Sequence, residues 1–597
     1  MAMAVLASGL VAAGAPADAD VAFERLAWDF EDGTSQGWFG RNAADGFGVV
    51  APGADSSYAI GVWDRTDQGS GPMIEIDQVV RPGQRLVFSA DVRFTEPVAD
   101  HLVTLSIQTG PSSFTNLITN MAVDADGAWT RIEGTFVVPA FTTMARLYLE
   151  SPWVGGARGE TAAFQVDNVV IDVPAALAWD RDLVPFRETL PGINAGVAVD
   201  SRDLIDEMGE VIAHHFSHLV GENHMKPDAW WTADPGAGTA WSAGVASFRI
   251  HPEARSILDF AQEHGMTVHG HVLVWHSQVP AWFFSLDDSG QEMAPTAANQ
   301  QEMVRRIWAY VGIVAGGIAA EYGPFGSDTN PVHSFEVANE VVHGGGVGAA
   351  ATHNLRPDSP WTRIFAPVAD STWVAERGYD NRDWFLYEAF QAADHYFNFV
   401  HHVGDARGRL NGRADRVTLW INDYNTERGL IEPANPATKR YQLLQVVNRL
   451  LEAGAPLDGV GHQFHAGLTV AVDGLRLALD LFAYENGYVA DRVLQAVTEI
   501  DVTIASNSPA NLVAQGSYYR AAFDIIRTHH IDHGDIATVT LWGLNDGRSW
   551  RGSQYPLLFH DDLTAKPAFY GAVVDAHVLD AEIWDRWERP ALPTVGR

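Results

Sequence analysis

The stretch PVHSFEVANEVVHGGG, residues 331–346, joins an apolar run to an amide, an acid and a series of glycines. Its first half, residues 332–338, has the composition of a buried strand. Asn339 and Glu340 follow directly, at the point where the chain is expected to turn. Because most glutamates are solvated surface residues, a carboxylate at the end of a buried strand indicates a functional site only if other strands supply partners for it.

The sequence on both sides of this stretch alternates short apolar runs with helical patterns, from residue 192 to residue 580. Eight strands that alternate with helices predict an α/β fold, a (β/α)8 barrel that carries insertions. Catalytic residues of such barrels lie after the carboxyl ends of the strands, which accounts for the position of Glu340. One predicted helix places five apolar residues on one face: Leu386, Phe390, Ala393, Phe397 and Val400. The predicted strands cover residues 194–199, 215–220, 267–275, 333–339, 417–422, 459–464, 496–500 and 538–542.

A region of different pattern precedes the barrel, from residue 24 to residue 173. Apolar and polar residues alternate there, as at Val103, Leu105 and Ile107, and turn signals such as Pro82-Gly83 recur at short intervals. No long helical pattern interrupts them, so this region is predicted to be an all-β sandwich. A linker over residues 174–191 is expected to join the two domains, and a C-terminal tail is expected over residues 581–597.

Composition limits the possible partners and the location of the protein. A net charge of −36 argues against nucleic acid or an anionic membrane as a partner, and a chain without cysteine has no disulfide or thiolate chemistry. Residues 1–20 resemble the core and cleavage region of a secretory signal peptide, although the basic leading segment is missing. That run is too short to cross a bilayer, and no later segment is expected to qualify. We therefore expect a secreted monomer; a misplaced start codon or a disordered tail is the alternative explanation of residues 1–20.

Two chemistries compete for the predicted mouth of the barrel. The pair His269 and His271 puts two imidazoles on one face of the third strand, as metal ligands require. Barrel hydrolases that use such a pair carry it on their first strand, which disfavours metal hydrolysis here. Cleavage of a glycosidic bond instead needs two carboxylates. Glu340 and Glu499 end the fourth and seventh strands, which face each other across the mouth, so the residues favour a glycosidase.

Aromatic and amide side chains at the other strand ends fit the same chemistry. Trp275, Trp542 and Trp550 suit the apolar faces of sugar rings, and nearby Asn, Gln, His and Lys side chains suit sugar hydroxyls. At this point the barrel closely resembles the endo-β-1,4-xylanases of glycoside hydrolase family 10 over most of residues 190–580. The motifs that carry the resemblance, in family order, are GENHMK (221–226), HGHVLVWHSQVPAW (269–282), VANE (337–340), INDYN (421–425), GHQFH (461–465), TEID (498–501) and LWGLNDGRSW (541–550).

The resemblance implies a role for each matching residue, and it implies that catalysis needs no cofactor. Glu340 is the expected acid/base and Glu499 the expected nucleophile of a retaining mechanism, with their carboxyl groups about 5–5.5 Å apart. Asn339 is expected to bond the sugar 2-hydroxyl. Gln463 and His465 are expected to orient Glu499, with Asp501 behind His465. The expected substrate-binding residues are Glu222, Asn223, Lys226, His271, Trp275, Gln278, Tyr424, Trp542 and Trp550.

The barrel also departs from the family pattern. Many relatives carry Asp where this chain has Glu336, a longer supporting carboxylate that is expected to affect Asn339. Residues 232–247 and 344–354 look like loops inserted at the mouth. These differences bear on substrate preference more than on the reaction.

The N-terminal sandwich resembles carbohydrate-binding module family 22. FEDGTSQGW (30–38), the GP pair (71–72), YLESP (148–152) and FQVDNVVI (164–171) carry this likeness. It implies Arg41, Tyr148 and Glu150 as ligand contacts, and a structural calcium to which Glu31 and Asp167 contribute. Residues 69–72 lack the tryptophan that such modules usually offer, so a spacer that binds nothing is the alternative.

Together these features predict a secreted, retaining endo-1,4-β-xylanase that acts on xylan or a related β-1,4-linked plant polysaccharide. Two alternatives stay open at this point. A β-1,4- or mixed-linkage glucanase would use the same two carboxylates, and a catalytically silent xylan-binding protein would use the same cleft. Intact Glu340 and Glu499 argue against the silent protein.

Overall fold

The computed structural model describes residues 25–573, except 82–83, 99–100, 112, 140, 142–143, 153–160, 174–176, 178, 232–240, 288, 344–352, 370–372, 374–375, 377–379 and 431. The chain divides into two compact units, residues 1–175 and 176–597. Residues 1–20 and 581–597, predicted as a signal-like segment and a tail, lie outside the described residues. So do most of the two predicted insertions.

The first unit is a β-sandwich, as the alternating pattern predicts. Sheet A has the strand order β3-β4-β11-β6-β9, with β1 paired to β11, and sheet B has the order β2-β5-β10-β7-β8. A core that includes Phe88, Val92, Leu105 and Phe164 fills the space between the sheets. The strands are β1 (Leu26–Trp28), β2 (Phe39–Gly40), β3 (Gly46–Val50), β4 (Ala59–Trp63), β5 (Pro72–Glu75), β6 (Arg85–Phe94), β7 (Leu102–Gly110), β8 (Ser113–Ala122), β9 (Thr130–Val137), β10 (Arg146–Glu150) and β11 (Phe164–Asp172).

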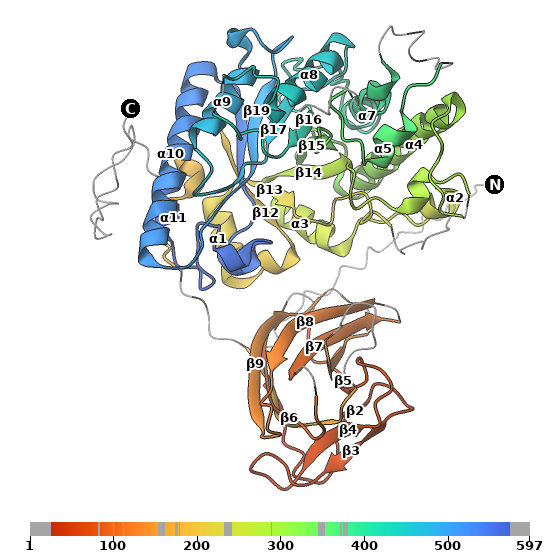
Figure 1. Ribbon diagram of the computed structural model, residues 1–597, viewed down its shortest axis with the longest axis vertical. Helices are drawn as coiled ribbons and strands as arrows, with labels where there is room; N and C mark the ends of the chain where they lie inside the picture. Colours follow the sequence, from red (N-terminus) through yellow and green to blue (C-terminus); the bar gives the residue numbers. More distant parts are fainter. Residues whose placement is uncertain are drawn as a thin grey trace, which may run out of the picture. The chain divides into compact units, whose positions relative to one another are not determined.

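The second unit contains a closed parallel barrel of eight strands (Figure 1). Its order is β17-β16-β15-β14-β13-β12-β20-β19, and β17 pairs with β19 to close the ring. The (β/α)8 prediction is confirmed, and each predicted strand overlaps an observed one. The strands are β12 (Asn194–Val199), β13 (His218–Gly221), β14 (Thr267–Val274), β15 (Val332–Asn339), β16 (Thr418–Asp423), β17 (Gly459–His462), β19 (Leu494–Thr503) and β20 (Ile536–Leu541), with the short β18 (His465–Gly467) beside β19.

Helices surround these strands in Figure 1. Several begin at a residue that suits a helix start: Thr296 and Ser508 each accept a backbone N–H of the first turn through the side chain. The main helices are α1 (Asp206–His215), α2 (Trp241–Val245), α3 (Pro252–Glu263), α4 (Ala297–Tyr322), α5 (Pro360–Ile364), α7 (Trp384–His395), α8 (Lys439–Glu452), α9 (Asp473–Phe482), α10 (Pro509–His533) and α11 (Pro567–Val573).

The predicted apolar face of α7 is correct except at its end. Leu386, Phe390, Ala393 and Phe397 are fully buried, but Val400 is 46% exposed. The helix continues after His395 as a π-helical turn, Tyr396–Val400. Because a π turn takes more residues than an α turn, it rotates Val400 away from the buried face.

Part of the predicted linker belongs to the barrel unit. A short 3-10 helix, η1 (Phe186–Thr189), places Phe186 and Leu190 in the core, where each is 1% exposed. The ring of Phe186 packs against Phe216 and Phe523. A linker over all of residues 174–191 is therefore wrong, since apolar side chains fix its second half to the barrel.

One helix among the described residues, α4, is long and apolar enough to cross a membrane by length and composition. The expectation that no segment beyond the N-terminus meets this test is therefore wrong. Buried side chains such as Ile307, Val311 and Val314 join the barrel core, and buried core helices pass the same test. The feature is weak evidence for a membrane, and the absence of a membrane partner stays a prediction.

Candidate active site

Glu499 lies on β19 and accepts two side-chain hydrogen bonds. Asn422 Nδ2 donates to its Oε1 at 2.9 Å, and His465 Nε2 lies 3.0 Å from its Oε2. The hydroxyl of Thr498 donates to Asn422 Oδ1 at 2.8 Å, which turns the amide nitrogen toward Glu499. Two donors aimed at one carboxylate fix its orientation, as a nucleophile requires.

His465 is itself held from behind by Asp501, at 2.8 Å from its Nδ1, as the resemblance implies. Burial alone would lower the pKa of His465, but the carboxylates of Asp501 and Glu499 raise it to about 10. The imidazole is therefore a cation at neutral pH, with one N–H for each carboxylate. Arg551 Nη1 and Trp550 Nε1 also donate to Asp501, at 2.6 and 3.2 Å, which fixes this row of groups.

Glu340 follows β15 directly and has a left-handed backbone, with φ +52°. Its N–H donates to the carbonyl oxygen of Asn422 at 2.9 Å, which anchors the turn. Such a φ is uncommon outside glycine and is held by surrounding contacts. Gln463 Nε2 donates to Glu340 Oε1 and to Asn339 Oδ1, both at 3.1 Å. The turn thus directs the carboxylate into the mouth, beside the amide of Asn339.

These contacts correct the expected role of Gln463. Its side chain was expected to orient Glu499, but its amide reaches Glu340 and Asn339 instead, and only its backbone carbonyl accepts the N–H of Glu499. The amide that does reach Glu499 belongs to Asn422. The sequence offered one signal for this residue, the position of Asn422 in the INDYN motif at a strand end.

Two cationic or polar groups beside Glu340 were also missed. Arg356 Nη2 lies 3.7 Å and His276 Nδ1 lies 3.8 Å from Glu340 Oε2. The guanidinium of Arg356 also donates to Tyr424 Oη at 3.0 Å and to the carbonyl oxygen of Glu340 at 3.1 Å. His276 stands in the recognised HGHVLVWHSQVPAW motif, whereas nothing in the local pattern marks Arg356.

Glu336 lies deeper in the barrel and supports the nucleophile side of the site. Its Oε2 is 3.1 Å from His271 Nδ1 and 3.6 Å from His269 Nε2, and it accepts from Asn422 Nδ2 at 3.2 Å. Burial would raise the pKa of Glu336, but the two imidazoles lower it to about 2. These side-chain contacts are with the two histidines and Asn422 and not with Asn339, and the expected effect on Asn339 stays a prediction.

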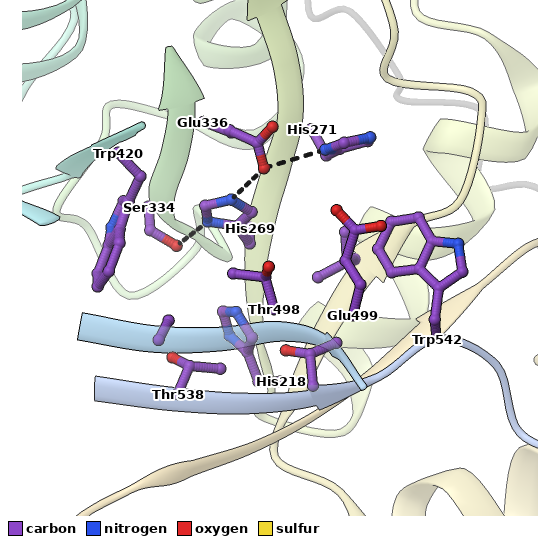
Figure 2. A pocket seen from close by; sticks show the side chains of 13 residues that line it. His218, His269, His271, Ser334, Glu336, Trp420, Thr498, Glu499, Thr538 and Trp542 are labelled. Carbon is purple, nitrogen blue, oxygen red and sulfur yellow. Dashed lines mark hydrogen bonds and ion pairs between the residues drawn. The ribbon is translucent and has the colours of Figure 1, made fainter. Parts of the chain in front are cut away.

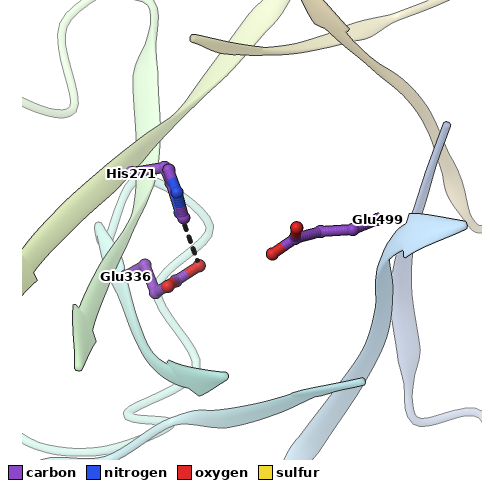
Figure 3. Close-up of side chains that lie close together, drawn as sticks. All are labelled: His271, Glu336 and Glu499. Carbon is purple, nitrogen blue, oxygen red and sulfur yellow. Dashed lines mark hydrogen bonds and ion pairs between the residues drawn. The ribbon is translucent and has the colours of Figure 1, made fainter. Parts of the chain in front are cut away.

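His269 and His271, the pair considered as metal ligands, therefore both contact the carboxylate of Glu336. Figure 3 shows His271 bonded to Glu336, with the Glu499 carboxylate pointing toward both from the opposite wall. One ligand atom from each of these three residues lies within 4.8 Å of the others. Asn422 Nδ2 donates to both carboxylates, so a shared amide joins this deeper layer to the nucleophile.

The barrel interior below the nucleophile is polar. His269 Nδ1 is 2.8 Å from Ser334 Oγ, and Figure 2 shows both beside Thr498 and His218. Burial lowers the pKa of His218 to about 3, so its imidazole is neutral. A small cavity lies among these side chains, which include Thr538, Thr540 and Trp420.

Above this layer, a cleft of about 510 Å³ opens at the carboxyl ends of the strands. Gln278 alone of the expected substrate-binding residues is not part of its lining. Burial raises the pKa of Glu222 to about 7, and it lowers the pKa of Lys226 despite the nearby carboxylates of Glu499 and Glu222. Residues that line the cleft are Glu222, Asn223, Lys226, His271, Trp275, Asn339, Glu340, Tyr424, Asn425, Arg428, Gln463, His465, Glu499, Trp542, Trp550 and Arg551.

Tryptophans and tyrosine give this cleft apolar surfaces. Trp542 is 7% exposed and packs edge-on against His271, whereas Trp550 is 61% exposed above His465. The ammonium of Lys226 lies 4.9 Å from the ring centre of Trp275 and donates to Asn223 Oδ1 at 3.1 Å. The cleft lining therefore combines hydrogen-bonding groups with flat apolar rings, which is the lining that sugar chains need.

The three residues expected to bind ligand in the sandwich lie together on the outer face of sheet B. The guanidinium of Arg41 lies 4.3 Å from the ring centre of Tyr148, and it donates to the carbonyl oxygen of Gly69 at 2.7 Å. Glu150 accepts from Ser106, and burial raises its pKa. Residues 69–72, where related modules usually offer a tryptophan, have none here, so Arg41 and Tyr148 are the proposed ligand contacts on this face.

Glu31 and Asp167 both contact the loop at residues 54–58, where calcium was expected. Glu31 Oε1 accepts the N–H groups of Ser57 and Tyr58, and Asp167 Oδ2 accepts from Ala54 N and Ser56 Oγ. Calcium is bound by oxygen ligands rather than by N–H donors. The two carboxylates hold the loop through these donors, and the expected calcium stays a prediction.

Glycosyl hydrolase family 10 matches residues 188–576, and a carbohydrate binding domain matches residues 27–156. The chain is 26% identical over 586 residues to endo-1,4-beta-xylanase A of Thermoanaerobacterium saccharolyticum, which covers 95% of this chain and 43% of that protein. It is 25% identical over 590 residues to exoglucanase XynX of Acetivibrio thermocellus, with coverage of 95% and 46%. The chain thus spans less than half the length of these relatives.

One solved structure has two modules in the same order along the chain. The CBM22-1 and GH10 modules of xylanase 10B from Clostridium thermocellum, complexed with xylohexaose, match with a TM-score of 0.50 and 22% identity, over 92% of this chain and 96% of that one. At this identity the likeness concerns the fold. The family 10 match covers more than half of the sequence and takes in both Glu340 and Glu499. The chain therefore belongs to glycosyl hydrolase family 10, with a carbohydrate-binding domain in front of its barrel.

Proposed function

We propose that this protein is a retaining endo-1,4-β-xylanase that hydrolyses internal bonds of xylan. One observation carries the proposal: two carboxylates at the mouth, Glu340 and Glu499, have separate sets of partners. Glu499 accepts from Asn422 and His465, whereas Glu340 accepts from Gln463 and has Arg356 and His276 at 3.7 and 3.8 Å from its other oxygen. Two carboxylates held separately at one mouth are what double displacement at a glycosidic bond requires.

The proposed reaction has two displacements. Glu499 attacks the anomeric carbon while Glu340 gives its proton to the leaving oxygen, and a glycosyl ester forms on Glu499. Glu340, now ionised, takes a proton from water as that water attacks the same carbon and releases Glu499. Both steps use side chains of this chain alone, and Asn339 lies beside Glu340 where a 2-hydroxyl can be held.

Release of short xylo-oligosaccharides from soluble xylan, followed by chromatography, tests the activity. Short products at early times support internal cleavage, and the anomer first formed, read by NMR, tests retention. Absence of any product would favour the silent xylan-binding protein. The same assay on Glu499→Ala shows whether contaminating enzyme contributes.

A β-1,4- or mixed-linkage glucanase is the second candidate. One relative bears the name exoglucanase, and xylose differs from glucose only by a hydroxymethyl group that loops around Lys226 and Trp542 must admit or exclude. Rates on xylan and on barley β-glucan, measured side by side at equal enzyme, separate the two. Faster hydrolysis of the glucan would replace the xylanase assignment.

The sandwich is proposed to bind xylan as a module of the family 22 type, through Arg41, Tyr148 and Glu150 on sheet B. Secretion is proposed from residues 1–20, and a monomer is proposed as the working form. Expression in a bacterial host, with sequencing of the N-terminus of any exported protein, tests secretion. Light scattering coupled to gel filtration tests the monomeric state.

A further inference from the structure

Sheet A carries an exposed tryptophan on the face opposite to the proposed ligand site of sheet B. Ile60 and Val62 of β4 belong to the sandwich core, so Gly61 and Trp63, which alternate with them, point outward. Trp63 is 39% exposed. Arg41, Tyr148 and Glu150 lie on the outer side of the other sheet, so the two surfaces do not share residues.

A glycine on the neighbouring strand, which has no side chain, lets the Trp63 indole lie flat against the sheet. Gly46 of β3 is paired with Trp63, and a Cβ built on Gly46 would lie 2.1 Å from Trp63 Nε1 and 2.4 Å from both Cδ1 and Cε2. Near-equal distances to three consecutive ring atoms mean that the ring presents its face, not its edge, to Gly46. The ring reaches Gly48, whose built Cβ would lie 3.5 Å from Cη2. Glycine at 46 is therefore required for this pose.

Polar groups continue the same surface across the sheet. Gly48, Gly61, Gln165 and Arg93 form one register row over β3, β4, β11 and β6, which spans about 14 Å at the usual strand spacing. Arg93 Nε donates to Gln165 Oε1 at 2.8 Å. No described residue accepts a hydrogen bond from Trp63 Nε1 or Gln165 Nε2 in this structure.

We propose that this surface, defined by Trp63, Gly48, Gly61, Gln165 and Arg93, is a second polysaccharide-binding site that takes a β-1,4-linked xylan segment. An exposed, flat indole matches the apolar face of a pyranose ring, and N–H donors at its side match equatorial hydroxyls. Gly48 and Gly61 place no side chain of their own in the row that leads from the ring to Gln165. The choice of xylan rests on the proposed function of the barrel.

Oxidation of tryptophan by N-bromosuccinimide, followed by peptide mass spectrometry, tests the site in the full chain. Glu499→Ala serves as the background, so that soluble xylan survives the experiment. Trp63 reports on sheet A, and Trp550, which is 61% exposed in the cleft, reports on the barrel in the same digest. Xylan should slow the oxidation of both residues several-fold, and dextran of equal mass should slow neither.

The outcomes distinguish the two proposals. Protection of Trp550 without protection of Trp63 overturns the second site and leaves the xylanase proposal intact. Protection of neither residue counts against both. If Trp63 becomes protected without polymer as protein concentration rises, the surface is an interface between copies of the chain and the proposal is wrong.

Two glycine variants provide a matched pair. Gly46→Ala should displace the indole and abolish the protection of Trp63 by xylan. Gly110→Ala lies at the end of β7 in sheet B, outside the proposed surface, and its added methyl meets only ordinary contacts with Ser113, so it should preserve the protection. Trp550 should be protected in both. Near-UV circular dichroism checks the fold of each variant. If Gly46→Ala unfolds the sandwich, protection of Trp63 in the chain that keeps Gly46 still decides whether the second site exists.

Discussion

At the scale of single residues, the division of labour between Glu340 and Glu499 has a direct chemical consequence. Glu499→Ala should abolish turnover of every glycoside, because no covalent intermediate can form. Glu340→Ala should cripple hydrolysis of xylan but spare the first step on aryl glycosides, whose leaving groups need no proton. Azide should then accelerate Glu340→Ala and give a β-glycosyl azide, identified by NMR. An α-azide from Glu499→Ala, with Glu340→Ala unresponsive, means that the roles are reversed.

Thr498 sets the direction of the amide that holds the nucleophile. Thr498→Val removes the hydroxyl that donates to Asn422 Oδ1, so the amide can turn its oxygen toward Glu499. We expect kcat to fall about tenfold, which corresponds to ~1.4 kcal/mol of barrier. Thr498→Ser keeps the hydroxyl and should stay close to the parent. Equal losses in both variants would point to packing rather than to the hydrogen bond.

The raised pKa of His465 predicts that the free energy of unfolding decreases as the pH becomes alkaline. Its folded pKa, about 10, lies above the ordinary value of 6.5, so the imidazolium stabilises the folded state fully below pH 6.5. That contribution is lost as pH rises through 10. Urea unfolding at pH 6, 8 and 10 should therefore show a steady decline that His465→Gln lacks between pH 6.5 and 10. A parallel decline in the variant would assign the effect to other groups.

At the scale of elements, mutations in η1 show whether this segment is part of the barrel unit. Phe186→Ala removes a ring that is 1% exposed and packs against Phe216 and Phe523. The expected loss in the free energy of unfolding is about 3–5 kcal/mol, as for other buried phenylalanines. Glu188→Ala, in the same turn but exposed, should change it by less than about 0.5 kcal/mol. Equal stability of the two variants would return this segment to the linker.

The π turn after α7 shows how an element can depart from a regular pattern without losing its role. Spacing by three and four residues predicted the helix and four of its five buried side chains. One added residue per turn then exposes Val400. The change also lets Asn398 bond to the backbone of Val417, at 3.0 Å from Nδ2, which ties this segment to the start of β16.

At the scale of the whole molecule, the two units are expected to divide binding and chemistry. Deletion of residues 1–173 should leave kcat/KM on short xylo-oligosaccharides unchanged, because the cleft is lined only by residues of the barrel unit. Affinity for polymeric xylan should fall, as measured by depletion onto insoluble xylan. Equal polymer affinity with and without residues 1–173 would make the sandwich a spacer.

The order of strands and the two carboxylates could be predicted from the sequence because each depends on local pattern. Buried parallel strands read as short apolar runs, and polar residues directly after them mark the mouth of a barrel. Glu340 and Glu499 stand out for this reason. The family motifs extend the same local signals to His465, Asp501 and most of the cleft lining.

Tertiary structure decided the directions in which side chains point. Gln463 bonds to Glu340, 123 residues away, and Asn422 bonds to Glu499, 77 residues away. No local pattern states which of two nearby carboxylates an amide will reach, since closure of the ring brings both within range. Arg356, Phe186 and the flat pose of Trp63 over Gly46 depend likewise on contacts between segments that only the folded chain places together.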